Sequence, residues 1–381
     1  MFARGAAGVR YRPTVAVIDL EAVRHNVRLL KPDEVGFMAV VKADGYGHGD
    51  VEVARAALQA GATWLGVALV EEGVGLREAD IEAPILVLTQ FPPGSEADAL
   101  EARLTPTLYT DVGLRRLAAA AASRPDRGPL GVHVKVDTGM HRVGLPPERA
   151  TGFVRDVADA GFVVEGLWTH FAKSEDLADP FTEEQTRRFR QVVADVRAEG
   201  VRPRALHAAN SAAAMALPAT WFDLLRVGVA MYGLPPGPGL PKASELRPAM
   251  SWKSAVALAK RVGAGEGLSY GLTHRLDREA TVATVPVGYA DGYGRLMGNR
   301  SEVLIRGRRY RVAGTVTMDQ LLVECGDDPI AEGDEVVLIG RQGSEEVTAG
   351  ELAGLLGTIA YEVVCGVSER VPREFVGGKA E

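Results

Sequence analysis

The residues best suited to chemistry in this chain stand at the ends of short apolar segments. They are Lys42, Lys135, Asp137, His170, His207 and Arg226. A lysine that ends a buried apolar strand loses hydration, which lowers its pKa and frees a neutral amine. Because a neutral amine forms a Schiff base with an aldehyde, we expect Lys42 to carry an aldehyde cofactor covalently. The competing interpretation is a solvated lysine before a turn.

The segment AVVKADGYGHG around Lys42 favours the cofactor. Its glycines at 45, 47 and 49 let the backbone approach a bound group closely. Tyr46 offers a hydroxyl that can donate a hydrogen bond to a phosphate. We therefore expect the cofactor to carry a phosphate as well as an aldehyde.

Two later loops are predicted to bind that phosphate. HAANSAAA begins a short helix at Asn210 or Ser211, and RVGVAMYGL offers the backbone N–H groups of Gly228 and Val229. In barrels of parallel strands, the loops after the seventh and eighth strands often bind phosphate at a helix N-terminus. The competing interpretation of Asn210 or Ser211 is a plain helix cap.

Arg226 restricts what such a cofactor can do. A guanidinium is always protonated and only donates hydrogen bonds, so beside a pyridine nitrogen it would leave that nitrogen unprotonated. The ring is then a weaker electron sink, which confines its reactivity to proton exchange at Cα. The competing interpretation is a salt bridge, and Lys135 or Arg142 taken alone is more typical of surface charge.

The elements that position these residues alternate regularly between strand and helix. Eight predicted strands, most of them followed by a helical pattern, cover 36–41, 64–69, 84–89, 104–110, 132–137, 162–170, 205–208 and 222–228. Eight such units favour a closed parallel barrel, whose active site lies at the carboxyl ends of the strands. An open doubly wound sheet is the competitor, but the chain has no glycine-rich dinucleotide turn.

A second domain is predicted after the Pro/Gly-rich stretch at 235–248. Strand patterns dominate beyond it, including 309–325 and 361–367, with one helix near 349–357. We therefore expect an α/β barrel domain over residues 1–240 and a mostly-β domain over residues 241–381.

The bulk properties exclude several classes of protein. The net charge of -7 without a basic cluster argues against a nucleic-acid partner, and no apolar run is long enough to cross a membrane. Two cysteines in 381 residues favour a reducing cytoplasm over a disulfide framework. We expect no metal site, and we expect the first dozen residues to form a loose arm.

The chain resembles the bacterial alanine racemases from about Pro13 to Arg373. AVVKADGYGHG resembles the family's cofactor-lysine signature, and KVDTGMHRVG, WTHFAKSED, LHAANSAAA, RVGVAMYGL, LSYG, VPVGYADGYGR, TMDQ and YEVVCGVSERVPR resemble further family segments in the right order. The resemblance implies an N-terminal (β/α)8 TIM-type barrel, a C-terminal mostly-β domain and pyridoxal 5'-phosphate on Lys42. It also implies a homodimer, in which the barrel mouth of one subunit and the C-terminal domain of the other form each active site.

The resemblance also assigns roles to single residues. Lys42 is the base for the α-proton of D-alanine, and Tyr270 of the partner subunit serves L-alanine, because racemisation needs bases on both faces of a planar intermediate. His170 and Arg226 form a hydrogen-bonded link behind the ring, with His207 near the tyrosine base. The phosphate is held by Tyr46, Ser211, Tyr361 and the backbone near Gly228, with Asn210 and Val229 beside it. Arg142 meets the ring oxygen or the substrate, Met318 lies near the substrate carboxylate with Asp319 in support, and Lys135 matches a lysine that is carbamylated in many members.

Two departures from the family pattern matter, and the one at position 317 keeps the substrate open. The family usually has Cys-Met-Asp where this chain has Thr317, Met318 and Asp319, and His141 stands where a small residue is common. The leading expectation is interconversion of L- and D-alanine, which supplies D-alanine for peptidoglycan. The alternatives are a racemase of serine or of a broader set of small amino acids, a non-catalytic pyridoxal-phosphate-binding protein, a fold-related decarboxylase and a cofactor-free barrel aldolase.

Overall fold

The computed structural model describes residues 11–123 and 129–378, which form two compact units. The barrel unit comprises residues 22–45 and 50–247. The described residues 11–21, 46–49 and 248–378 make up the β unit.

The barrel unit contains the eight parallel strands that the sequence predicts. Two four-stranded sheets have the orders β4-β3-β2-β9 and β5-β6-β7-β8. Backbone hydrogen bonds join the sheets at both seams, from Val87 N to Thr105 O (3.0 Å) and from Asp223 N to Leu206 O (2.9 Å), so the barrel closes. The strands are β2 (Gly36–Val40), β3 (Trp64–Val67), β4 (Ile85–Val87), β5 (Thr107–Leu108), β6 (Gly131–Lys135), β7 (Val163–Trp168), β8 (Ala205–His207) and β9 (Leu224–Val227).

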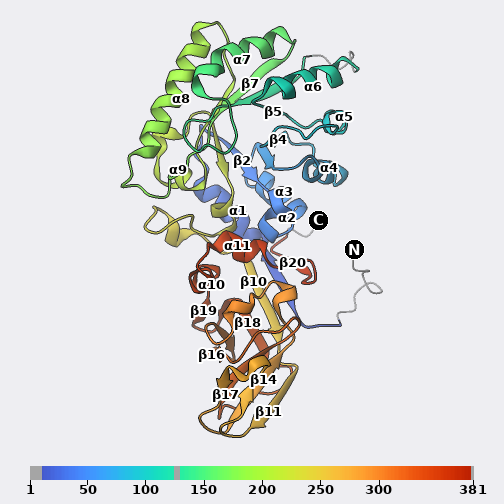
Figure 1. Cartoon of the computed structure of the whole chain (residues 1–381), viewed down its shortest axis with the longest axis vertical. Coiled ribbons are helices and arrows are strands. Elements are labelled where there is room, and N and C mark those ends of the chain that lie inside the picture. The colour runs from blue at the N-terminus through green and yellow to red at the C-terminus, as the bar shows by residue number, and fades with distance from the viewer. Residues whose placement is uncertain (1–10, 124–128, 379–381) are drawn as a thin grey trace. The chain divides into compact units, whose positions relative to one another are not determined.

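Helices connect successive strands, as parallel pairing requires. Those from α4 to α8 lie outside the strands in Figure 1, with apolar faces packed inward and charged faces in solvent. The helices are α1 (Leu20–Leu30), α2 (Lys42–Gly47), α3 (Asp50–Gln59), α4 (Val70–Glu78), α5 (Glu96–Glu101), α6 (Asp111–Ala122), α7 (Pro147–Asp159), α8 (Phe181–Ala198) and α9 (Ser211–Ala216).

The β unit is built on one ten-stranded sheet. Its order is β11-β14-β17-β16-β15-β18-β10-β1-β20, with β19 paired to β18. The strands are β1 (Val15–Asp19), β10 (Met250–Ala255), β11 (Leu258–Val262), β14 (Ala280–Val285), β15 (Glu302–Ile305), β16 (Arg308–Val312), β17 (Leu321–Gly326), β18 (Glu335–Gln342), β19 (Glu345–Val347) and β20 (Arg373–Val376). A short hairpin of β12 (Gly267–Leu268) and β13 (His274–Arg275) and the helices α10 (Ala349–Leu356) and α11 (Ala360–Cys365) complete it.

The division of the chain differs from the predicted one at both ends of the barrel. Strand β1 pairs antiparallel with β10 and parallel with β20, so residues 11–21 belong to the β unit. The later boundary falls between Arg247 and Pro248 rather than after residue 240. The local pattern of β1 identifies a strand but carries no information about its partners, which lie more than 200 residues away.

Three local expectations were wrong. Residues 360–365 are the helix α11 rather than a strand, because a short apolar run does not distinguish the two. The predicted strand 309–325 is two strands, β16 and β17, separated by a loop that contains Gly314 at φ +82°. Arg12, within the expected loose arm, is anchored by hydrogen bonds from its guanidinium to Pro286 O and Arg370 O. Residues 1–10 of that arm lie outside the described part.

The structure can be compared with two expectations drawn from the composition, on membrane spans and on disulfides. None of the helices in the described part of the chain is both long and apolar enough to span a membrane. Cys325 is buried and Cys365 is exposed, and neither takes part in a disulfide.

Candidate active site

The chemistry-bearing residues of the barrel unit lie at the carboxyl ends of its strands. Lys42 follows β2, Lys135 ends β6, His170 follows β7, His207 ends β8 and Arg226 is the next-to-last residue of β9. Burial, followed by the charge of Arg226, lowers the pKa of both Lys135 and His170, and the charge of Lys42 adds a smaller effect on each, so these groups lie within electrostatic reach of one another. Closure of the barrel therefore brings together residues that are far apart in sequence.

The backbone after Lys42 has an unusual conformation. Ala43, Asp44, Gly45 and Tyr46 have φ angles of +54°, +52°, +59° and +54°, which is a left-handed helical turn. Such a turn costs roughly 1–2 kcal/mol for each residue other than glycine. Strain of this kind persists only where the surrounding structure determines it, and it clusters at functional sites.

Glu72, which the sequence did not single out, holds this turn. Its Oε1 accepts a 2.7 Å hydrogen bond from Ala43 N, while Oε2 accepts from Ala68 N (2.8 Å) and Leu69 N (3.1 Å). One carboxylate thus caps helix α4 and ties its N-terminus to the residue after Lys42. The position of Glu72, three residues into a helix, is the sequence signal that could have found it.

Arg226 is the centre of a buried hydrogen-bond network. Its Nη2 donates to His170 Nδ1 (3.1 Å), Thr169 O (2.8 Å) and Ala208 O (2.9 Å). Its Nη1 lies 3.2 Å from His207 Nδ1, and His207 Nε2 lies 2.9 Å from His133 Nδ1. Every side-chain hydrogen bond of Arg226 to the described residues leaves from Nη1 or Nη2, and none from Nε.

The donor-only guanidinium sets the tautomers of these histidines. Because Arg226 cannot accept, Nδ1 of both His170 and His207 must be the acceptor, and each ring carries its proton on Nε2. His207 then donates to His133, which is buried. The sequence analysis did not single out His133, although a histidine inside an otherwise apolar strand could have drawn attention to it.

Burial and the charge of Arg226 keep the network's histidines neutral. The pKa of His133 is lowered to about 3 by burial and then by Arg226, and the pKa values of His170 and His207 are lowered well below 6.5 for the same reasons. Burial lowers the pKa of the Arg226 guanidinium to about 9, which leaves it charged at neutral pH. One fixed positive charge therefore faces three neutral rings.

Trp168 packs this network from one side. The His207 ring is stacked on it with centroids 5.4 Å apart and 9° between planes, and the Arg226 guanidinium lies 4.7 Å from its ring centroid. Lys135 Nζ lies 4.1 Å from the same centroid. The tryptophan thus orients one ring and compensates two cations through its π face.

Lys135 is a perturbed lysine. It is 5% exposed, and burial, followed by the charges of Arg226 and Arg142, lowers its pKa to about 7. It lines a small pocket with Asp137, Arg142 and His170. At neutral pH about half of this amine is uncharged.

The predicted phosphate loops are organised around Ser211. Its Oγ accepts hydrogen bonds from Gly228 N (3.0 Å) and Ala230 N (3.4 Å), so the loop after β9 lies against the start of α9. Asn210 is the cap of α9, with Oδ1 accepting from Ala213 N (3.1 Å) and from Ser174 Oγ (2.7 Å). Of the two cap candidates the structure selects Asn210 and leaves the Ser211 hydroxyl with the glycine loop.

Tyr46 and Tyr361 lie together in the β unit. Their ring centroids are 6.3 Å apart, and burial, with Tyr361 and Cys365 nearby, raises the pKa of the Tyr46 hydroxyl above its usual value. Tyr46 therefore remains a proton donor. Gly47 allows this packing, because an added Cβ would lie 2.4 Å from Val364 O.

Tyr270 and Met318 are exposed side chains of the β unit. Tyr270 begins a short 3-10 turn (Tyr270–Leu272) and is 75% exposed, and Met318 is 53% exposed. The Thr317 hydroxyl is bound within its own loop, since its Oγ1 donates to Gln320 O (2.9 Å) and accepts from Gln320 N (3.2 Å). The side chain that departs from the family pattern thus closes a tight turn.

The comparisons with known proteins agree on one family. Residues 18–236 match the family model of the alanine racemase N-terminal domain, and residues 249–375 match that of the C-terminal domain. An alanine racemase of Symbiobacterium thermophilum is 51% identical over 372 residues, which cover 97% of this chain and 98% of the relative. One of Desulfovibrio desulfuricans is 44% identical over 375 residues, covering 96% and 98%.

Solved structures extend the similarity to the fold. The alanine racemase of D-cycloserine-producing Streptomyces lavendulae superposes with a TM-score of 0.92 at 40% identity, covering 97% of this chain and 98% of that one. The Bacillus anthracis enzyme with bound L-Ala-P gives a TM-score of 0.90 at 37% identity, covering 97% and 96%. The predicted fold class, a (β/α)8 barrel with a mostly-β domain, is confirmed.

Proposed function

The chain belongs to the alanine racemase family, and we propose that it interconverts L-alanine and D-alanine with pyridoxal 5'-phosphate held covalently on Lys42. The observation that carries the proposal is the buried Arg226 network beside Lys42, within a chain that matches both family domains. Supply of D-alanine for peptidoglycan in the cytoplasm is the corresponding cellular role.

The residues of the site suit this cofactor. Lys42 would supply an amine for the aldehyde, and Ser211, Tyr46, Tyr361 and the N–H of Val229 would supply donors for the phosphate. The N–H groups of Gly228 and Ala230 donate to Ser211 Oγ and hold its hydroxyl in place. Arg226 offers a permanent donor to a ring nitrogen, because its Nε makes no hydrogen bond to the described residues. When bound, pyridoxal phosphate supplies an electron sink that acidifies the α-proton of the amino acid.

Arg226 accounts for the choice of reaction. Its guanidinium stays protonated and cannot accept, so it holds the ring nitrogen without giving it a full proton. The neutral His170 and His207 fix the guanidinium plane without adding positive charge. A decarboxylase would need an acidic partner at this position instead, so the network favours racemisation.

Two bases would exchange the α-proton. Lys42 Nζ takes or returns it on one face, and the hydroxyl of Tyr270 of the partner subunit does so on the other. The large exposure of Tyr270 and Met318 in the single chain suits residues that a homodimer would cover. Tyrosine has an ordinary pKa near 10, so a neighbouring donor must tune it. The sequence pointed to His207 for this place, but His207 is fully buried and its Nε2–H donates to His133. We propose that the Nε2–H of His170 takes this role instead.

Substrate recognition would fall to Arg142 and Met318. Arg142 lines the pocket of Lys135, and conversion of the Lys135 amine to a carbamate would give Arg142 an anionic partner. Alanine is favoured over serine because the Thr317 hydroxyl donates its only proton to Gln320 O and so has none to donate to a substrate hydroxyl. This engaged hydroxyl makes Thr317 a structural replacement for the family's cysteine.

Chiral product analysis tests the proposal. Purified protein with pyridoxal phosphate is given L-alanine and L-serine in separate reactions. Rapid D-alanine with little D-serine is expected. Comparable or faster D-serine would make the protein a broader racemase, and no racemisation of either would overturn the proposed activity in favour of a non-catalytic cofactor-binding role.

A further inference from the structure

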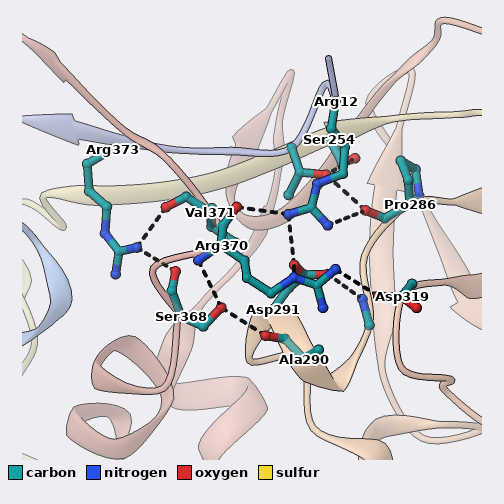
Figure 2. Close-up of polar contacts among 12 residues, drawn as sticks. Arg12, Ser254, Pro286, Ala290, Asp291, Asp319, Ser368, Arg370, Val371 and Arg373 are labelled. Atoms are coloured by element: carbon teal, nitrogen blue, oxygen red, sulfur yellow. Dashed lines mark hydrogen bonds and ion pairs between the residues drawn. The ribbon is translucent and has the colours of Figure 1, made fainter. Parts of the chain in front are cut away.

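A single buried carboxylate, Asp291, joins both ends of the β unit (Figure 2). Its side chain is fully buried, and Oδ1 lies 2.8 Å from Arg12 Nη2 and 3.6 Å from Arg370 Nε. The other oxygen, Oδ2, accepts a 3.0 Å hydrogen bond from Gly288 N. Two guanidinium groups compensate the buried charge, which would otherwise be strongly unfavourable.

Arg370 extends this cluster to the loop that carries Met318. Its Nη2 donates to Asp319 Oδ1 over 2.7 Å, and its carbonyl oxygen accepts a 3.0 Å hydrogen bond from Arg12 Nη2. Figure 2 shows the Arg370 guanidinium between the carboxylates of Asp291 and Asp319. Arg370 therefore links the buried carboxylate of Asp291 to the exposed loop that carries Met318.

The turn that contains Asp291 also holds this loop through the main chain. Tyr289 N donates to Thr317 O and Ala290 N donates to Met318 O, each over 3.0 Å. Gly288 permits the approach, because an added Cβ would lie 2.3 Å from both carbonyl oxygens. The loop is thus fixed from two sides by one turn.

The other end of the same loop holds Tyr270. Thr315 Oγ1 donates to Tyr270 O (2.9 Å), and Ser269 Oγ donates to Thr315 O (2.5 Å). Ser269 has a φ of +60°, so this corner is strained and depends on its partners. Residues 315–319 therefore form a short strut between the Tyr270 corner and the Asp291 cluster.

We propose that Asp291 and Arg370 are positioning residues that fix the strut 315–319 and, through it, the places of Met318 and Tyr270. The importance of these two side chains rests on the proposed function. A loosened strut moves Met318, which weakens binding of alanine, and moves Tyr270, which slows proton removal from the L-isomer. Neither Asp291 nor Arg370 needs to touch the substrate.

The test uses the exposed end of the cluster, where folding is least at risk. Arg370→Gln and Asp319→Asn each break the Arg370–Asp319 pair, and Asp327→Asn is the matched control. Asp327 and Asp319 are 63% and 59% exposed, and each carboxylate lies 2.7 Å from an arginine of the same unit. Asp291→Asn is a second variant that attacks the buried end.

We expect the first two variants to raise the KM for alanine by roughly two- to fivefold, the range that a partly exposed ion pair allows. The primary deuterium isotope effect should rise more for L-alanine than for D-alanine. The double variant Arg370→Gln/Asp319→Asn should raise the KM for alanine no further than Arg370→Gln alone does, because both substitutions break the same Arg370–Asp319 interaction. Asp291→Asn should produce the larger change, and Asp327→Asn should match the wild type.

Two readouts distinguish a positioning role from a general loss of folded protein. The first is the pattern of kinetic changes, because a smaller folded fraction lowers kcat equally for L- and D-alanine and leaves KM and the isotope effects unchanged. Hydrogen–deuterium exchange gives a measure independent of activity, because the amides of Tyr289 and Ala290 should exchange faster in Arg370→Gln.

Variants that equal Asp327→Asn in KM, isotope effects and amide exchange would overturn the inference. If the wild type fails to racemise alanine, the proposed function fails, and amide exchange alone then decides whether Asp291 and Arg370 position the strut.

Discussion

The clearest quantitative prediction concerns the charge of Lys135. With a pKa of about 7, roughly 90% of its amine is neutral at pH 8, whereas a lysine with the ordinary value of 10.5 is about 0.3% neutral. The reactive fraction at pH 8 is therefore roughly 300-fold larger than for a surface lysine. A neutral amine adds to CO2, forming an N–C bond to give a carbamate and releasing one proton.

Carbon-13 NMR of protein equilibrated with labelled bicarbonate measures this modification. At constant dissolved CO2 the initial rate of carbamate formation after labelled bicarbonate is added should follow the neutral fraction of the amine, with a pH midpoint at about 7, and the signal should be absent from Lys135→Arg. Arg142→Gln should move the midpoint to higher pH, because the charge of Arg142 helps to lower the pKa of Lys135. The same substitution removes the cation that an anionic carbamate would pair with, so its final occupancy should fall.

Two results would refute this reasoning. A midpoint near 10 would mean that Lys135 is solvated and charged at neutral pH. The absence of any Lys135-dependent signal at pH 8 would mean that its pocket excludes CO2 or that the neighbouring carboxylate of Asp137 keeps the amine protonated.

Three further perturbations probe the site. Tyr270→Phe should slow exchange of the α-proton of L-alanine with deuterated water by at least about 100-fold, as loss of a general base does, while cofactor absorbance is retained; unchanged exchange would contradict the two-base scheme. Glu72→Gln should destabilise the protein by roughly 1–3 kcal/mol and lower cofactor retention on dialysis. The glutamine NH2 group would point at one of the three backbone N–H groups that the Glu72 carboxylate now accepts from, and two donors cannot pair. Glu71→Gln, at the exposed neighbouring position, is the control. His207→Phe keeps the stack on Trp168 but leaves a buried Arg226 N–H unpaired, so urea unfolding should show a loss of about 1–3 kcal/mol at pH 7.5. The folded-state pKa of His207 lies well below 6.5, so below pH 6.5 unfolding takes up a proton at this residue. As the pH falls through this range, the free energy of unfolding of the wild type should therefore decrease by about 1.4 kcal/mol per pH unit more than that of His207→Phe. Parallel curves for the two proteins would show that His207 is already protonated in the folded state.

Local patterns in the sequence were sufficient for most of the fold. The eight barrel strands are short apolar runs followed by helical periodicity, and both signals depend on neighbours within a few residues. For the same reason Lys42, Lys135, His170, His207 and Arg226 could be placed at strand ends, and eight units implied one common rim. The prediction of a strand at 361–367 was wrong because a helix and a strand show the same apolar pattern over so few residues.

The sequence by itself determined which chemical groups are present and which strand each one follows. Only the tertiary structure decided their environment: the 2.9 Å contact between His207 and His133, the tie from Glu72 to Ala43, and the anchoring of Arg12 by residues near the other end of the chain. These contacts join residues 29 to 358 positions apart, so no local pattern encodes them. The perturbed pKa values follow from the same cause, because burial and neighbouring charge exist only once the barrel has closed.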